Sequence, residues 1–203
     1  MSVLKGKDLS AYQGNQLIFA GLSFDVTAGQ PLQVTGPNGC GKSTLLRGIA
    51  GLHAFSDGDV LIDEKPWKRD SLLYLDHRTA LKPMLSVGAN LQHWWCALKG
   101  NMADLPAAMQ KWGVAGLEDI EIGQLSLGQQ RRVQLVLLEC GSKDIWVLDE
   151  TSHGLDQAGQ DLLLKTLTSH PGVLILAAHA QMFDNQLDLQ EYAPHASVVT
   201  ASL

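Results

Sequence analysis

The chain has 203 residues, of which 45% are hydrophobic, and its 21 acidic against 15 basic residues give a formal net charge of −6. This length predicts one globular domain with a buried core, and the acidic balance gives no electrostatic footprint for nucleic acid or anionic lipid. No apolar run approaches the ~20 residues that cross a bilayer, and the N-terminus lacks a secretion signal. The three cysteines have neither metal-ligand nor disulfide spacing. We therefore expect a cytoplasmic protein.

The first third of the chain has the pattern of short strands. Apolar segments, some with strict alternation, are separated by Gly14, Gly21 and Gly29. Glycine between such segments is typical of turns. The expected strands lie at residues 4–9, 16–19, 22–26, 31–35, 58–63 and 72–75.

Residues 36–44 interrupt these strands with the sequence G-P-N-G-C-G-K-S-T. An expected strand before them and a short helical pattern at 45–51 are the context in which G-x-x-x-x-G-K-S binds phosphate. Glycines let backbone N–H groups surround an anion, Lys42 supplies a charge for the β- and γ-phosphates, and Ser43 offers a hydroxyl to Mg²⁺. The predicted phosphate-binding residues are Gly36, Pro37, Asn38, Gly39, Cys40, Gly41, Lys42, Ser43 and Thr44.

Two features of this loop have a second interpretation. A glycine-rich turn occurs by chance in many proteins, but here the flanking strand and helix agree with the motif. We favour Cys40 as a small loop residue; a regulatory thiol is the alternative, because a helix N-terminus lowers the pKa of a thiol.

Residues 79–125 change to a helical pattern. Ser86 is placed to cap a first helix, and Asp104 is placed to cap a second helix that Gly113 ends. The first helix carries an apolar stripe with the spacing i, i+3, i+4, i+7. We favour core packing of this stripe; docking of a partner is the alternative, because tryptophans are typical interface anchors. The stripe consists of Leu91, Trp94, Trp95 and Leu98.

From residue 126 the chain alternates between helix and strand. Ser126 is placed to cap a helix that Gly141 ends. Two later strands are apolar throughout, which is typical of parallel strands covered on both faces, so the order predicts an α/β fold. The expected elements are helices at 127–140 and 161–167 and strands at 145–148, 173–178 and 197–200.

Asp149 and Glu150 directly follow one of these buried strands. Ligands of open α/β sheets bind at the carboxyl ends of the strands. Asp149 is therefore placed to reach Mg²⁺, and Glu150 is placed to polarise a water that attacks the γ-phosphate. A solvated strand end is the usual explanation of such a pair, but the phosphate loop upstream favours the catalytic interpretation.

Residues 125–132 read L-S-L-G-Q-Q-R-R, and with the preceding motifs they resemble the ABC-type ATPases, whose signature L-S-G-G-Q precedes a helix. The resemblance covers nearly the whole chain. It implies a P-loop NTPase (RecA-like) core with an antiparallel β subdomain, forming a single ABC ATP-binding domain over 1–203 with a small helical subdomain inserted at about 79–128. Further matches, in the family's order, are Tyr12, residues 152–156 and His179.

The resemblance also implies how the chain binds and hydrolyses ATP with Mg²⁺. Two copies pair head to tail around two ATP molecules, so that Ser126 and Gly128 of one copy contact the γ-phosphate held by Lys42 of the other. Gln129 is a further nucleotide-binding residue of the signature. Tyr12 stacks on adenine, and His179 is the switch histidine. A lone histidine after an apolar strand is more often a packed core or surface residue, but the order of the motifs favours the switch role.

Within that group, the chain looks most like the CcmA family, the haem-exporter ATPases of cytochrome c maturation. The similarity rests on residues 125–133, 21–24, 74–77 and 81–82, and on the length near 200 residues. It implies haem delivery, integral membrane permease partners similar to CcmB and CcmC, and a peripheral position at the cytoplasmic face of the inner membrane. The alternatives are a soluble non-transport ABC ATPase, which a single acidic cassette disfavours, and a nucleotide-gated subunit with weak turnover.

Four departures from the family pattern bear on turnover and coupling. Leu127 replaces the first signature glycine, Thr151 replaces the usual proline, and residues 153–154 make the D-loop atypical. Arg78 stands where the family has a Q-loop glutamine that contacts the metal and the attacking water, and arginine cannot accept a hydrogen bond. Its side chain either reaches the γ-phosphate or points away to a carboxylate; we favour the second, because a cation beside Lys42 is electrostatically crowded.

Overall fold

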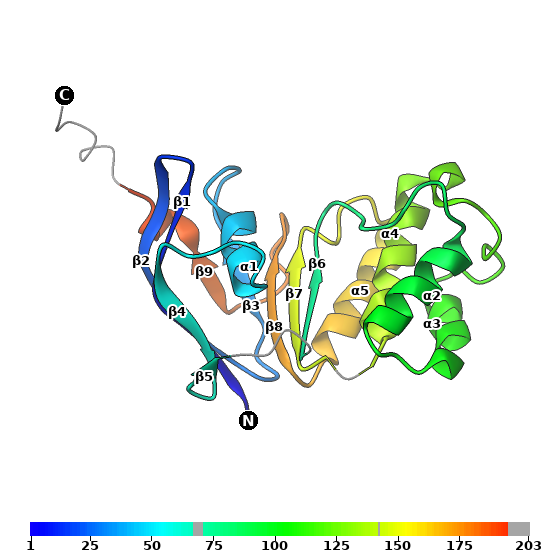
Figure 1. Ribbon diagram of the computed structural model, residues 1–203, viewed down its shortest axis with the longest axis horizontal. Helices are drawn as coiled ribbons and strands as arrows, with labels where there is room; N and C mark the ends of the chain where they lie inside the picture. The colour runs from blue at the N-terminus through cyan, green and yellow to red at the C-terminus, as the bar shows by residue number, and fades with distance from the viewer. Residues whose placement is uncertain (67–70, 142, 195–203) are drawn as a thin grey trace.

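Two β-sheets and a group of helices lie side by side in the computed structural model, which describes residues 1–66, 71–141 and 143–194 (Figure 1). The first sheet is antiparallel, with the order β2-β1-β4-β5. The segments expected as two strands at 16–19 and 22–26 form one strand, because a register shift near Gly21 (φ 67°) continues the pairing with β1. The strands are β1 (Val3–Gln13), β2 (Gln16–Thr27), β4 (Asp57–Ile62) and β5 (Lys65–Pro66).

The second sheet is parallel, with the order β6-β7-β8-β3-β9. Every residue of β7 and β8 is buried, as expected for strands covered on both faces. Strand β9 is not predicted from the sequence, because its three mostly polar residues show no apolar pattern. The strands are β3 (Leu32–Thr35), β6 (Leu72–Leu75), β7 (Ile145–Asp149), β8 (Val173–Ala177) and β9 (Gln186–Asp188).

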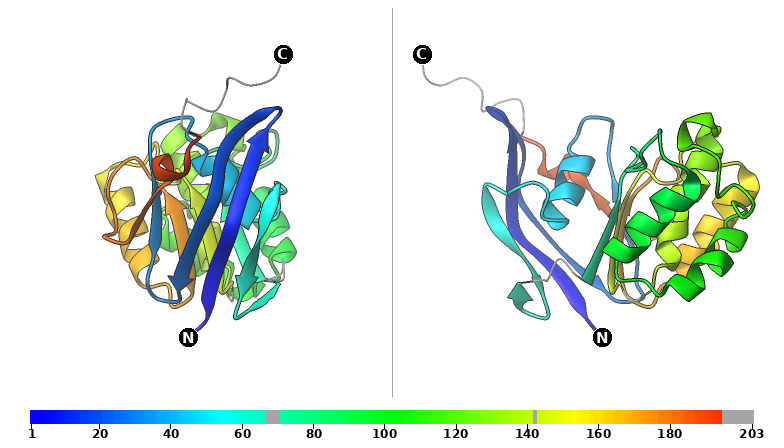
Figure 2. Two further views of the ribbon diagram at one scale, coloured as in Figure 1. Left: turned by 90° about the vertical axis from the view of Figure 1, so that its left-hand side faces the viewer. Right: turned by 45° about the vertical axis from the view of Figure 1, so that its right-hand side comes forward.

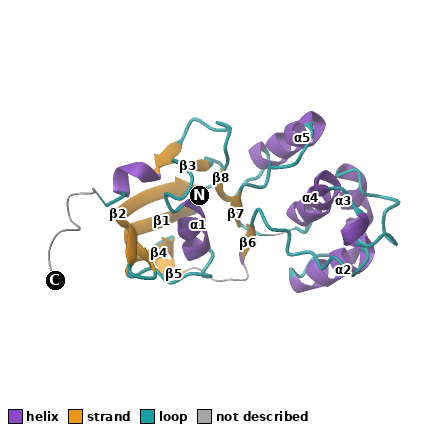
Figure 3. Cartoon of the chain, turned by 90° about the horizontal axis from the view of Figure 1, so that it is seen from above, coloured by secondary structure: helices purple, strands orange, loops and turns teal. Residues whose placement is uncertain are grey.

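Helices cover both faces of the parallel sheet. Helix α1 lies between the two sheets, whereas α2 to α5 lie beyond the opposite face of the parallel sheet (Figure 2, Figure 3). A separate apolar core fills each side. Within the described ranges, no helix combines the length and apolarity needed to cross a membrane. The helices are α1 (Lys42–Ile49), α2 (Val87–Ala97), α3 (Leu105–Lys111), α4 (Leu127–Leu135) and α5 (Gln157–Thr168), with 3₁₀ turns at Met102–Asp104, Ile122–Gln124, Val136–Glu139 and Leu189–Tyr192.

Several predicted helix ends are confirmed, as is the α/β fold with an added antiparallel sheet. Ser86 caps α2 by accepting a hydrogen bond from the N–H of Ala89. Ser126 caps α4 in a reciprocal capping box with Gln129. Gly51, with φ 69°, follows the end of α1.

Other predicted ends are wrong. Helix α5 begins four residues earlier than expected, because Asp156 accepts a hydrogen bond from the N–H of Gly159 and caps it there. Asp104 is the N-cap residue of α3 as predicted, but its side chain makes no capping hydrogen bond. The helix expected over 127–140 ends at residue 135 and continues as a 3₁₀ turn. The strand expected at 197–200 lies outside the described residues.

Candidate active site

The loop at residues 36–41 connects β3 to α1, and glycines determine its shape. Gly36, Gly39 and Gly41 have φ angles of 131°, 83° and 107°, in the region that favours glycine. Space also excludes a side chain at Gly41, since an added Cβ would lie 2.4 Å from Cγ2 of Ile18. A glycine loop at the N-terminus of a helix is the arrangement that binds phosphate.

Lys42, the first residue of α1, reaches back over this loop. It is only 8% exposed, and its Nζ donates to the carbonyl oxygens of Gly36 (2.9 Å) and Pro37 (3.1 Å). The ammonium group is thereby held at a polar cavity of about 360 Å³, which we call the nucleotide cavity. The nucleotide cavity is lined by Gln13, Ile18, Asn38, Gly39, Gly41, Lys42, Ser43, Thr44, Arg47, Glu150 and His179.

Asp149 ends β7 and is 1% exposed. Neither carboxylate oxygen has a hydrogen-bond partner among the described residues. Burial raises the pKa of this carboxyl, the nearby Ser43 hydroxyl opposes the shift, and the charge of Glu150 adds to it. Oδ2 of Asp149 lies 4.0 Å from Nδ1 of His77. A buried carboxylate that lacks a hydrogen-bond partner and lies next to a hydroxyl offers the hard oxygen ligands that Mg²⁺ prefers, so these residues fit the metal that the motif implies.

Glu150 and His179 close one side of the nucleotide cavity. Nε2 of His179 lies 3.4 Å from Oε2 of Glu150. The N–H of Glu150 donates to the carbonyl of Ala177 (2.9 Å), and its φ of 53° is uncommon outside glycine. The strained backbone thus belongs to the residue that the sequence predicts as the catalytic base.

Four predicted nucleotide-binding residues do not line this cavity. Tyr12 is 47% exposed on β1, next to the lining residue Gln13. Ser126, Gly128 and Gln129 lie at the start of α4, in the helical part of the molecule (Figure 1). Ser126 Oγ accepts from the N–H of Gln129 (3.2 Å), and Gln129 Oε1 accepts from the N–H of Ser126 (2.9 Å), so both side chains cap the helix.

Three residues of the phosphate loop also lie outside the nucleotide cavity. Gly36 lines a smaller neighbouring cavity of about 190 Å³, which Lys42 and His179 line as well. Pro37 contributes the carbonyl that binds Lys42. Cys40 is a half-buried free thiol whose Sγ would lie 2.8 Å from a Cβ added at Gly36.

Three lining residues are not predicted from the sequence. Gln13 and Ile18 come from the β1–β2 hairpin, and only the packing of that hairpin over the loop brings them to the site. Arg47 lies in the last turn of α1, where its guanidinium binds the carboxylate of Asp76 (3.2 Å). Arg47 lies on the helix that begins at Lys42, and this position in the sequence is a signal that places it near the phosphate loop.

Residues 76–78, which follow β6, are held by α4. Arg131, 5% exposed, donates to the carbonyl oxygens of Asp76 (3.1 Å) and His77 (2.6 Å). Its Nε donates to the carbonyl of His153 (3.3 Å) in the loop after β7. Burial lowers the pKa of Arg131. One buried side chain therefore connects the helix of the signature sequence to two loops near the nucleotide cavity.

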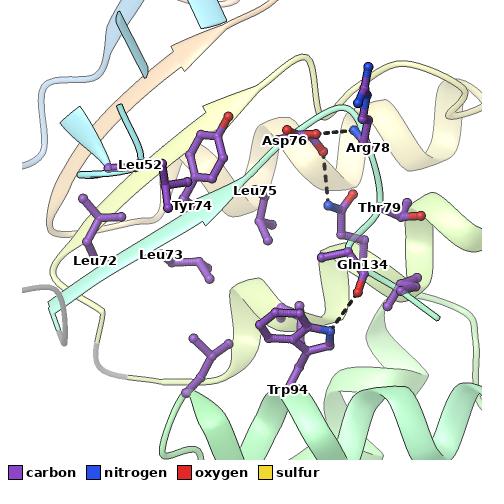
Figure 4. Close-up of a pocket in the computed structure, with 15 residues that line it drawn as sticks. Leu52, Leu72, Leu73, Tyr74, Leu75, Asp76, Arg78, Thr79, Trp94 and Gln134 are labelled. Carbon is purple, nitrogen blue, oxygen red and sulfur yellow. Dashed lines mark hydrogen bonds between the residues drawn. The ribbon is translucent and has the colours of Figure 1, made fainter. Parts of the chain in front are cut away.

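A second, apolar pocket of about 530 Å³ lies between β6 and α2 (Figure 4), and we call it the apolar pocket. Trp94 lines it half-buried, with Nε1 donating to the carbonyl of Ala80 (3.2 Å). Trp95 is fully buried. The predicted stripe is therefore divided: core packing is confirmed for Trp95, whereas Trp94 borders a surface pocket.

Arg78 lines the apolar pocket and not the nucleotide cavity. Its exposed side chain extends away from Asp76 and Gln134, while its backbone N–H binds the Asp76 carboxylate (Figure 4). No carboxylate of the described residues forms an ion pair with the guanidinium. The absence of Arg78 from the lining of the nucleotide cavity agrees with the favoured prediction, but the expected carboxylate partner is absent from the described part of the chain.

Residues 19–153 match the family model described as ABC transporter. The chain is 40% identical over 182 residues to the cytochrome c biogenesis ATP-binding export protein CcmA of Brucella abortus (strain 2308), covering 87% of this chain and 85% of that protein. It is 38% identical over 202 residues to the CcmA protein of Vibrio cholerae serotype O1, covering 93% of this chain and 97% of that protein.

Solved structures share the fold. A putative ABC transporter ATP-binding protein from Pyrococcus furiosus matches with a TM-score of 0.83 at 23% identity, over 95% of this chain and 100% of that chain. A bacterial Atm1-family ABC exporter with ATP bound matches with a TM-score of 0.77 at 24% identity, over 88% of this chain and 35% of that chain. The chain therefore belongs to the ABC transporter ATPases, in the family of the cytochrome c biogenesis ATP-binding export proteins CcmA.

Proposed function

We propose that this chain is the ATP-hydrolysing subunit of an exporter complex that delivers haem for cytochrome c assembly. The observation that carries the proposal is a single cavity combining Lys42, Glu150 and His179 from three separate segments, in a chain of the CcmA family. Haem as the cargo comes from the family resemblance. Residues 1–203 act as one ATP-binding domain, with the helical part at about 79–128 inserted.

ABC ATPases generally bind ATP with Mg²⁺. In this chain the loop N–H groups and Lys42 hold the β- and γ-phosphates, while Ser43 and Asp149 hold the metal. The ion, when bound, neutralises charge that develops on the phosphates. The oxygens of buried Asp149, which accept no hydrogen bond from the described residues, support this assignment.

The side chains at the cavity wall carry the proton chemistry in this proposal. Glu150 accepts a proton from the attacking water, and the contact of 3.4 Å to His179 orients that carboxylate. His179 is also placed to donate a hydrogen bond to the γ-phosphate. Tyr12 stacks on adenine at the rim of the cavity, beside Gln13.

A second copy of the chain completes the site. Members of this family work as dimers with membrane permease partners. Ser126, Gly128 and Gln129 lie away from Lys42 of their own chain, which leaves them available to the γ-phosphate held by a partner copy. A hydroxyl, backbone N–H groups and a helix N-terminus attract an anion. This placement supports a head-to-tail homodimer around two ATP molecules.

The apolar pocket is the surface on which we expect an integral membrane permease similar to CcmB or CcmC to dock. Trp94 and the 60% exposed Leu52 line it, and aromatic side chains are typical interface anchors. Asp76 lines this pocket and binds Arg47, which lines the nucleotide cavity, so one ion pair joins the two sites. The chain would then lie peripherally at the cytoplasmic face of the inner membrane, held only through its partners.

A nucleotide-gated subunit with weak turnover is the second candidate, and Arg78 favours it. The arginine lies outside the nucleotide cavity, so the site lacks the glutamine that the family uses beside the metal and the water. Steady-state ATP hydrolysis by the purified chain separates the candidates. Sustained, Mg²⁺-dependent turnover supports the ATPase, whereas tight ATP binding without turnover supports the gated subunit.

The haem role is tested in cells that lack this chain. We expect such cells to lose haem-stained c-type cytochromes, and we expect the wild-type gene to restore them while Glu150→Gln does not. Haem in b-type cytochromes is the control and stays unchanged. Normal c-type cytochromes in the deleted cells would contradict the role in cytochrome c assembly, even if the purified chain hydrolyses ATP.

A further inference from the structure

Gln33 is a buried polar residue in the middle of an apolar strand. It lies in β3 between Leu32 and Val34, and it is 1% exposed. Its two neighbours belong to the core on the α1 side of the sheet. Because side chains alternate along a strand, Gln33 points to the other face, where residues 178–183 cross the sheet.

The Gln33 side chain uses both of its polar atoms on that crossing segment. Nε2 donates to the carbonyl oxygens of Ala180 (2.8 Å) and Ala178 (3.5 Å). Oε1 accepts from the backbone N–H groups of Met182 (2.8 Å) and Phe183 (3.1 Å). The carbonyls of residues 178 and 180 stand on either side of His179, so one side chain holds the backbone before and after the histidine.

The crossing segment itself is half-buried to exposed, but the backbone groups that it turns toward the buried Gln33 need such partners, because an unpaired backbone group away from water is costly. Residues 178–183 belong to none of the described strands, whereas β8 before them pairs with β7. Gln33 and His179 line the same small cavity beside the phosphate loop. The glutamine is therefore connected to the position of the imidazole, which lies 3.4 Å from the Glu150 carboxylate.

We propose that Gln33 is a positioning residue for ATP hydrolysis, which fixes the loop that presents His179 to Glu150 and to the γ-phosphate. The inference rests on the role proposed above for His179. The new element is that a residue of β3, the strand that leads into the phosphate loop, fixes the position of the histidine. A change at this buried position alters the chemical step without touching the nucleotide.

Gln33→Met tests the proposal, because methionine matches the shape of glutamine and forms none of its hydrogen bonds. We expect kcat for ATP hydrolysis to fall between about tenfold and a hundredfold, which is the loss that displacement of a catalytic group causes. We expect KM to stay unchanged. A variant with wild-type kcat would overturn the proposal. Should Gln33→Met fail to fold, Gln33→Glu keeps an acceptor for the two N–H groups and loses the donor; the same fall in kcat is expected, and wild-type kcat would again overturn it.

Asn90 provides a matched control in the helical part of the molecule. It is 2% exposed, its Oδ1 accepts from the N–H of Lys82 (2.7 Å), and its Nδ2 donates to the carbonyls of Lys82 (3.1 Å), Leu85 (3.2 Å) and Ser86 (3.0 Å). Asn90→Leu therefore removes a comparable clamp far from His179. We expect it to lower the melting temperature as Gln33→Met does while leaving kcat unchanged. An equal loss of kcat in both variants would show a general effect of lost stability and overturn the proposal.

A double-mutant cycle with His179→Ala separates failure of this inference from failure of the histidine assignment. If Gln33 acts through His179, adding Gln33→Met to His179→Ala causes no further loss in single-turnover hydrolysis. Additive losses would overturn the role of Gln33 and leave that of His179 intact. Wild-type turnover in His179→Ala alone would overturn both.

Discussion

The nucleotide cavity and the apolar pocket are linked by the ion pair between Arg47 and Asp76, but different kinds of residue line them. The nucleotide cavity is lined by glycine backbone, Lys42, Ser43 and Glu150. The apolar pocket is lined mainly by leucines and by Trp94. Polar groups fixed around a point suit a small anion with a metal, whereas a wide apolar hollow suits protein side chains. The contrast assigns ATP hydrolysis to the nucleotide cavity and attachment to a membrane partner to the apolar pocket.

The largest effect should come from the base in the nucleotide cavity. We expect Glu150→Gln to keep ATP affinity and to lower turnover by about 10²–10⁴-fold, because the amide retains the shape and cannot take up the proton. The loss of turnover should trap a closed dimer, visible by size-exclusion chromatography with ATP. Full turnover by this variant would show that another group polarises the water.

The apolar side of the molecule should respond in stability. Trp95 is fully buried, and its Nε1 donates to the carbonyl of Asn101 (2.9 Å). Trp95→Ala removes a large core side chain, so we expect the free energy of unfolding to fall by about 3–5 kcal/mol in chemical denaturation. A change below about 1 kcal/mol would contradict the assignment of Trp95 to the core.

The cation of the nucleotide cavity comes next. Lys42→Ala should abolish tight ATP binding, with affinity falling about 100-fold in calorimetry, because the loss of a charge-assisted contact to phosphate is uncompensated. Lys65→Ala, which removes the same charge from the exposed strand β5, serves as the control and should bind ATP normally. Unchanged affinity in Lys42→Ala would refute the assignment of the loop.

A smaller effect is expected in the apolar pocket, where Trp94 should affect binding of the membrane partner. We expect Trp94→Ala to reduce co-purification with a membrane partner about tenfold, which is ~1.4 kcal/mol, with little change in turnover of the isolated subunit. Gln92→Ala, an exposed change on the same helix, is the control. If Trp94→Ala unfolds the protein instead, this tryptophan is a core residue like its neighbour.

Arg78 should produce the smallest change. Its side chain lies outside the nucleotide cavity, so Arg78→Ala should alter turnover little. Arg78→Gln introduces the glutamine of the family pattern, which can accept a hydrogen bond, and we expect turnover to rise several-fold. A fall of more than about tenfold in Arg78→Ala, or ~1.4 kcal/mol, would show that the arginine reaches the phosphates.

The sequence predicts best those features that a few adjacent residues determine. The phosphate loop is encoded by glycines between a strand and a helix, and the cap at Ser126 is encoded within one turn of helix. Asp149 and Glu150 are located by the apolar run before them. Each of these depends on local backbone geometry, which the neighbouring residues fix.

Features that depend on packing between distant segments were not predictable in the same way. Trp94 and Trp95 belong to the same apolar stripe of α2, so the sequence does not distinguish them. Only the packing of α2 against β6 leaves Trp94 at a pocket while Trp95 is buried. Gln33 reads as an ordinary strand residue, because its partners lie about 145 positions later in the chain.

The most direct test of the separation between the two sites places Glu150→Gln and Trp94→Ala in the same two assays, ATP turnover of the purified subunit and co-purification from detergent-solubilised membranes. We predict that Glu150→Gln loses turnover and retains its membrane partner, while Trp94→Ala retains turnover and loses the partner. Parallel loss of both properties in each variant would contradict the account.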